Sequence, residues 1–161
     1  MASVEEKLKE LGLELSEAPK PVAAYIPAKQ VGELVFISGQ LPFRNGQLMY
    51  VGKVGAERTQ QEGFQAAELC AINALAIAKS VAGSLEKVRE IVQVRGFVNC
   101  TPDFTHQPEV INGASELLVK LFGDSGRHAR AAVGASSLPR NATVEVEMIV
   151  RMTSKEIGHV G

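Results

Sequence analysis

The chain has 161 residues, a net charge of −1, 45% apolar and 22% charged residues, a composition typical of one globular domain. The near-neutral charge disfavours a general nucleic-acid binder, which usually shows a basic excess. We expect no membrane span, because no apolar run approaches the roughly 18 residues that one needs. Cys70 and Cys100 are the only cysteines, so we expect no disulfide framework, no zinc cluster and a cytoplasmic setting.

Caps, periodicity and turn residues divide the chain into predicted elements. Capping boxes at Ser3 and Thr59 mark the starts of two helices. In chain order, the predicted elements are a helix over residues 1–12, a connector over 13–21, extended pieces over 22–28 and 33–39, a turn-rich stretch over 40–57, a helix over 59–82, a strand over 89–99, a polar loop over 100–106, a helix over 108–122, strands over 129–136 and 143–152, and a tail over 153–161.

The order of these elements predicts an α+β fold in one domain over residues 1–161, with the N-terminal helix and connector in 1–19. Two long helices cannot cover both faces of a sheet of five or more strands, so both are expected on one face. Gly113, in the middle of the second long helix, is expected to permit close packing there. The other sheet face then combines apolar residues with charges, which predicts self-association.

Arg130 is the residue that indicates chemistry most clearly. It lies among small residues in Ala129–Val133, which leave room for a ligand carboxylate to reach the planar guanidinium. An intrachain salt bridge or an exposed strand end is the simpler interpretation from chemistry alone. Glu145 is the obvious internal partner. If the last two strands form a hairpin, however, the two residues lie four positions apart, roughly 13 Å along the ladder, so they would meet only between subunits.

Four other residues are candidates for a site. Glu145 could act as a general acid or base if it is partly buried, although a solvated strand carboxylate is the simpler interpretation and Glu147 has the same parity. Ser38 and Gly39 end a strand where backbone amides could meet a ligand, or they form an ordinary turn. Tyr25, placed in the first strand, could line a pocket or be a core tyrosine.

Weaker signals come from three further groups. Arg127, His128 and Arg130 could bind an anion, but a solvated cluster is the simpler interpretation. Cys70 lies on the covered face of the first long helix and is expected to be an inert core thiol. Cys100 follows a strand and could be more reactive, but no histidine adjoins it in sequence.

Several short segments, in a fixed order, carry a resemblance to a known family. They are Val35–Pro42, Gly96–Val98 with Asp103–Phe104, Ala129–Val133 with Leu138–Pro139, and Val144–Glu147. Across about residues 20–152, this ordered set resembles the Rid family, the YjgF-type enamine/imine deaminases that are also labelled endoribonuclease L-PSP. The resemblance implies a chorismate-mutase-like α+β fold, with a mixed sheet and two helices on one face. It also implies a homotrimer with sites at the subunit interfaces, and neither metal nor cofactor.

The resemblance also implies a reaction and roles for named residues. The reaction is hydrolysis of an enamine or imine such as 2-aminoacrylate to a 2-keto acid and ammonia. Arg130 would hold the substrate carboxylate, and Glu145 would position water or deliver a proton. Tyr25, Ser38, Gly39 and Ala132 match positions that line the family's site.

The sequence departs from the family pattern at three positions. Ala132 stands where many deaminating members have cysteine, His128 where proline is usual, and Pro102 where asparagine is frequent. These departures keep two alternatives open. One is a non-catalytic trimer that binds carboxylates or another protein through the Arg130 pocket. The weaker one is an endoribonuclease, which the neutral charge does not support.

Overall fold

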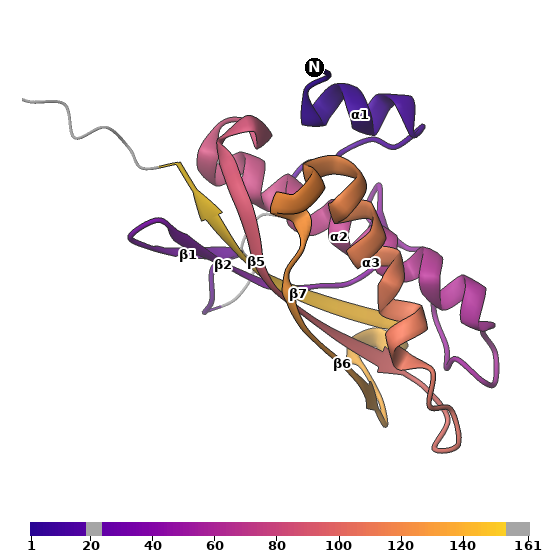
Figure 1. Cartoon of the computed structure of the whole chain (residues 1–161). Coiled ribbons are helices and arrows are strands. Elements are labelled where there is room, and N and C mark those ends of the chain that lie inside the picture. The colour runs from indigo at the N-terminus through magenta and orange to yellow at the C-terminus, as the bar shows by residue number, and fades with distance from the viewer. Residues whose placement is uncertain (19–23, 154–161) are drawn as a thin grey trace, which may run out of the picture.

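The computed structural model describes residues 1–18 and 24–153, and it confirms the predicted α+β fold (Figure 1). In chain order the elements are α1 (Val4–Glu10), β1 (Ala28–Val31), β2 (Leu34–Gln40), β3 (Phe43–Arg44), β4 (Gln47–Leu48), α2 (Gln60–Ala82), η1 (Leu85–Lys87), β5 (Val88–Asn99), α3 (Gln107–Phe122), η2 (Gly123–Gly126), β6 (Ala129–Ala135), η3 (Pro139–Asn141) and β7 (Val144–Met152).

A five-stranded mixed sheet, in the order β1-β2-β7-β5-β6, supports both long helices on one face. The predicted alternation along β7 is confirmed, because Val144, Val146 and Met148 are all buried under the helices. Glu145 and Glu147 between them therefore point to the opposite face. We call this second face the open face. Its register across strands is set by pairs such as Glu145 with Phe97 and Glu147 with Arg95.

The caps of α1 and α2 form as the sequence predicts. The Ser3 and Thr59 hydroxyls accept from Glu6 N and Glu62 N, and both capping boxes are complete. Gly83 ends α2 at φ 87°, a left-handed conformation that favours glycine. We expected no segment long and apolar enough to span a membrane, but α2 meets that criterion by length and composition. Yet 67% of its apolar window is buried inside the fold, as in a core helix.

The last two strands do not form the hairpin that the register estimate assumed. β6 pairs with β5 in parallel, with Arg130 opposite Val94, and β7 lies antiparallel between β2 and β5. The reason is the crossover through α3, because a strand–helix–strand unit returns its second strand parallel to the first. The chain then passes through η3 and inserts β7 at the centre of the sheet.

The first predicted strand is also misplaced. The described part of the predicted segment is residues 24–28, of which only Ala28 lies in a strand, as the first residue of β1, whereas 24–27 contain bends. Residues 19–23 lie outside the described residues, as does most of the predicted tail. Asn45 and Gly46 form the predicted turn between β3 and β4, both at positive φ.

Gly113 brings the two long helices into close contact, as predicted. A Cβ built on Gly113 would lie 2.8 Å from the carbonyl carbon of Phe64 in α2, and closer still to the oxygen. No side chain fits in that space, so glycine is required despite its low helix propensity. This contact fixes α3 against α2 and thereby the face that α3 presents to β6.

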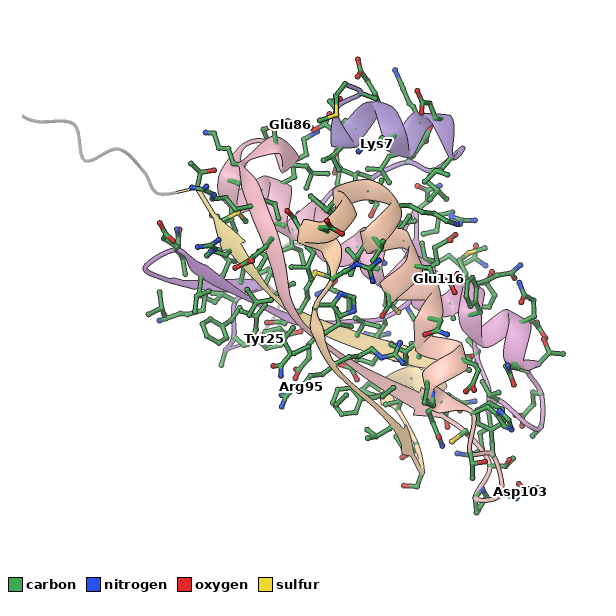
Figure 2. All side chains as sticks on the ribbon, in the orientation of Figure 1. Lys7, Tyr25, Glu86, Arg95, Asp103 and Glu116 are labelled. Atoms are coloured by element: carbon green, nitrogen blue, oxygen red, sulfur yellow. The ribbon has the colours of Figure 1, made fainter. Side chains whose placement is uncertain are left out.

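The N-terminal helix α1 docks on the ends of other elements rather than on the sheet. Val4 and Leu8 are buried, Val4 N donates to Glu86 Oε1 at 2.6 Å, and Lys7 Nζ donates to Leu121 O at 3.3 Å. Figure 2 labels Lys7 and Glu86 at this junction. The lysine thus satisfies a free carbonyl at the C-terminal end of α3.

Candidate active site

Arg130 lies on the edge strand β6, on the same side of the sheet as α3. It is in register with Val94, which is buried under the helices. Its Nη1 donates to Asn112 Oδ1 at 2.8 Å and to Ser115 Oγ at 3.2 Å, both on α3. Within residues 1–18 and 24–153, no carboxylate oxygen lies within 4.0 Å of this guanidinium. The structure therefore contradicts the alternative of an intrachain salt bridge among these residues. The other alternative, an exposed strand end, agrees with the structure, because Arg130 is exposed and is the second residue of β6.

Glu145 projects from β7 on the open face and lies against Gly39. A Cβ on Gly39 would be 3.0 Å from Glu145 Cδ, and nearer to Oε1. The missing side chain is therefore what lets this carboxylate reach the end of β2. Burial raises the pKa of Glu145, and the charge of Glu147 raises it further. The structure thus separates two carboxylates that the sequence treats as equivalent.

Ser38 fixes the segment that precedes β1. Its Oγ donates to Ile26 O at 2.8 Å, and its backbone N–H donates to Pro27 O at 2.8 Å. Tyr25 lies in a bend of this segment, not in a strand, and is 60% exposed. The expectation of a core tyrosine is therefore wrong for this chain. Ser38, Gly39 and Glu145 lie together, and Tyr25 lies one residue from the segment that Ser38 holds.

A hollow of about 420 Å³ on the open face adjoins this group. Its lining includes Ile26, Phe36, Ser38, Arg95 and Glu147. Arg95 forms an ion pair with Glu147 across the β5–β7 ladder, and Figure 2 labels Arg95 and Tyr25 on the side of the sheet away from α3. The sequence analysis missed Arg95, because only the register of β5 with β7 places it opposite a glutamate.

Within one chain, Arg130 and Glu145 do not meet. Glu145 on β7 is in register with Phe97 on β5, which is in register with Val133 on β6. Val133 lies three residues beyond Arg130 and so on the opposite face of the sheet. Two strand spacings and three residues separate the two Cα atoms by roughly 14 Å. The conclusion that they do not pair directly is confirmed, although the hairpin that supported it is wrong. Ala132, partly buried against the core, follows Arg130 on the same face.

The cluster of Arg127, His128 and Arg130 is divided by the structure. Arg127 Nε lies 3.4 Å from Asp124 Oδ1 on η2. His128 and Arg130 instead contact the same hydroxyl, that of Ser115. Asn112 and Ser115 were not identified from the sequence, because nothing in the apolar stripe of α3 indicates which strand its polar residues face.

Neither cysteine takes part in this arrangement. Cys70 is fully buried, its Sγ donates to Val144 O at 3.6 Å, and burial raises its thiol pKa well above the usual value. This confirms an inert core thiol. Cys100 is buried, and its Sγ accepts from Gln107 Nε2 at 3.6 Å, which does not support the more reactive alternative.

Fold and side-chain placement define a class of protein, and comparison with known proteins agrees with it. The chain belongs to the Rid, or YjgF/RutC, family: the family profile described as "YjgF/chorismate_mutase-like, putative endoribonuclease" matches residues 5–152. The fold resemblance inferred from the sequence is thereby confirmed, as is membership of the family.

Individual relatives cover most of the chain. Protein TCP17 of Trypanosoma cruzi is 38% identical over 148 residues, covering 91% of this chain and 92% of its own. A 2-iminobutanoate/2-iminopropanoate deaminase of Dermatophagoides farinae is 33% identical over 134 residues, covering 83% and 89%. The crystal structure of Atu1372 from Agrobacterium tumefaciens, a protein of unknown function, superposes with a TM-score of 0.88 at 45% identity, covering 92% of each chain.

Proposed function

We propose that the protein hydrolyses small 2-imino acids and their enamine tautomers, and that it does so as a homotrimer with sites between protomers. Water adds to the imine carbon, the carbon–nitrogen bond then breaks, and the products are a 2-oxo acid and ammonia. The family and the relative named as a deaminase support this reaction class. The proposal assigns substrate binding to Arg130 and water activation to Glu145.

The observation that carries the proposal is the state of the Arg130 guanidinium. Arg95 and Arg151 on the open face each pair with a glutamate, whereas Arg130 contacts two neutral oxygens on α3. A guanidinium keeps its positive charge at all physiological pH values. Held by neutral acceptors and exposed to solvent, it retains the capacity to bind a carboxylate from outside the chain.

Glu145 has properties suited to proton transfer during imine hydrolysis. Its carboxylate is half-buried, and its pKa is raised toward the working pH by burial and by Glu147. A carboxylate in that state accepts a proton from the attacking water and returns one to the departing nitrogen. Gly39 leaves the room that the Glu145 carboxylate itself occupies, since a Cβ at this position would meet Oε1.

A second copy of the chain is needed to unite these groups, since one chain holds them on opposite sheet faces. The open face suits assembly, because Phe36 is 42% exposed and Val133 46% exposed beside ionic residues. Closed rotational assembly places the same two surfaces in contact at every interface. Arg130 of one protomer would then face Glu145 of the next, three times per trimer.

The direct test supplies an unstable substrate. A pyridoxal-phosphate-dependent dehydratase generates 2-iminobutanoate from threonine, and the rate of 2-oxobutanoate formation is followed with and without this protein. Acceleration by the wild type that is lost in Arg130→Ala supports the proposal. No acceleration, with retained binding of 2-oxobutanoate, favours a carboxylate-binding trimer instead. Cleavage of RNA that survives Arg130→Ala would favour the endoribonuclease reading.

A further inference from the structure

A chain of hydrogen bonds leads from the Arg130 guanidinium into the fold. Arg130 Nη1 donates to Ser115 Oγ at 3.2 Å, Ser115 Oγ lies 2.8 Å from His128 Nε2, and His128 Nδ1 lies 2.6 Å from Gly126 O. A carbonyl oxygen only accepts, so Nδ1 carries the ring proton and donates to Gly126. In the neutral ring Nε2 is then an acceptor, and the Ser115 hydroxyl donates a hydrogen bond to it.

Because the Ser115 hydroxyl donates to His128, its oxygen is left to accept from Arg130. Burial of the ring lowers the His128 pKa most; the hydrogen bond to the Gly126 carbonyl opposes this in part, and the charge of Arg130 lowers the pKa further. The His128 ring is therefore neutral at neutral pH, as this series of hydrogen bonds requires. Charged groups of the adjoining segments include Asp124 on η2, which pairs with Arg127 just after it. On α3 they are Glu109, Glu116 and Lys120.

The donor inventory shows which edge of the guanidinium remains available. Arginine has five N–H donors, two of them on Nη1. Both Nη1 hydrogens are used, by Asn112 Oδ1 at 2.8 Å and by Ser115 Oγ. The Nε hydrogen and both Nη2 hydrogens have no acceptor among the described residues. Nε and Nη2 form one edge of the planar group, with the spacing that binds both oxygens of a carboxylate.

We propose that Asn112, Ser115 and His128 are positioning residues for Arg130, and that they hold its Nη1 side against α3 so that the Nε–Nη2 edge binds the carboxylate of a 2-oxo or 2-imino acid. The inference rests on the proposed use of Arg130 for substrate binding. It assigns a role to His128, which stands where the family usually has proline. The three residues fix the direction of approach without touching the ligand.

Binding of 2-oxobutanoate, the stable product of the proposed reaction, tests this without turnover. Calorimetry at pH 7.5 is expected to show a dissociation constant about tenfold higher for Asn112→Ala and for Ser115→Ala, because each loses one hydrogen bond to a charged group. Ser115→Thr, which keeps the hydroxyl, is expected to bind within about twofold of the wild type. Ser125→Ala, the same type of change at an exposed serine of η2, is the matched control and should bind normally.

A spectroscopic measurement separates positioning from a general loss of structure. In wild-type protein, the Nε–H signal of Arg130 in a ¹H–¹⁵N spectrum should be resolved and should shift when 2-oxobutanoate binds. In the Asn112→Ala/Ser115→Ala double variant, it should broaden or exchange away, while backbone amide signals and the melting temperature stay close to wild type. Persistence of a sharp, ligand-responsive signal would overturn the proposal.

The outcomes also distinguish this inference from the proposed function. If Arg130→Ala abolishes binding and the double variant binds like wild type, the positioning inference fails and the role of Arg130 stands. If Arg130→Ala binds as well as wild type, both fail. If wild type binds through Arg130 but does not accelerate imine hydrolysis, the enzymatic proposal fails and the positioning inference is still decided by Ser115→Ala against Ser115→Thr.

Discussion

The two faces of the sheet differ in how their residues are stabilised. Under α2 and α3, Val94, Val146 and Met148 are 0–2% exposed and belong to the hydrophobic core cluster. On the open face, Phe36 is 42% exposed, and arginines and glutamates pair across strands. One face is complete within a single chain, whereas the other carries both unpartnered apolar surface and a half-buried carboxylate. Of the two residues proposed to carry the chemistry, Glu145 lies on the open face, whereas Arg130 lies on the covered side, at the exposed edge strand β6.

Replacing Arg130 is expected to have the largest effect. Arg130→Ala should lower kcat/KM for 2-iminobutanoate by about 10²–10³-fold, because the carboxylate loses a charge-assisted bidentate contact. Arg130→Lys should recover little of it, since an ammonium cannot form the planar fork. Arg151→Ala, which removes an arginine already paired with Glu90 at 2.8 Å, is the control. An equal loss in both variants would contradict a special role for Arg130.

Glu145→Gln should lower kcat by about 10²-fold, because the amide cannot take the proton of water. It should also raise stability at neutral pH. The folded-state pKa of Glu145 is raised, so the folded chain binds a proton more tightly than the unfolded chain, and stability falls as pH rises from about 4.5 through the raised value. The glutamine variant should lack this slope in urea titrations at pH 4 to 8.

Glu90→Gln provides the comparison, since that carboxylate is ion-paired on the same face. It should leave kcat unchanged and alter stability by about 1 kcal/mol or less. A stability gain at neutral pH in Glu90→Gln, but not in Glu145→Gln, would contradict the raised pKa assigned to Glu145.

The covered face is tested by Gly113→Ala. The added methyl group would meet the backbone of Phe64, so the helices must separate, and the free energy of unfolding should fall by about 1–3 kcal/mol. Gly134→Ala is the matched control, because its Cβ would lie 3.0 Å from the side chains of Cys100 and Gln107, which can move. Equal losses in the two variants would show that helix contact does not set the requirement for glycine.

The smallest effect is expected from His128. Burial and the charge of Arg130 lower its folded-state pKa below 6.5, so below that pH the unfolded chain binds a proton that the folded chain resists. Stability should therefore decline as pH falls through this region. In His128→Gln, the difference in melting temperature between pH 7.5 and 5.5 should shrink, by less than about 3 °C. An unchanged difference would contradict the neutral ring.

Local patterns predicted the elements that local interactions determine. The capping boxes, the β7 alternation and the close approach at Gly113 all depend on neighbours in sequence or on one packed face. The parallel pairing of β6 with β5 did not follow from such patterns, because a crossover through α3 and a hairpin with β7 bury similar residues. The wrong hairpin register therefore came from topology, not from strand assignment.

The site was predictable only in part, for the same reason. Arg130 and Glu145 were identified by residue type and by resemblance, but their partners depend on pairings across strands and helices. Asn112 and Ser115 become visible only once α3 is known to lie over β6. Gly39 acquires its meaning only when Glu145 is placed beside it across the β2–β7 pair.

The most direct test of the account mixes two inactive proteins. Arg130→Ala and Glu145→Gln protomers are combined in equal amounts, unfolded and refolded together, and assayed for hydrolysis of 2-iminobutanoate. If each site takes Arg130 from one protomer and Glu145 from the next, random assembly restores about a quarter of wild-type activity. Activity no higher than the average of the two separate variants would contradict a site shared between protomers.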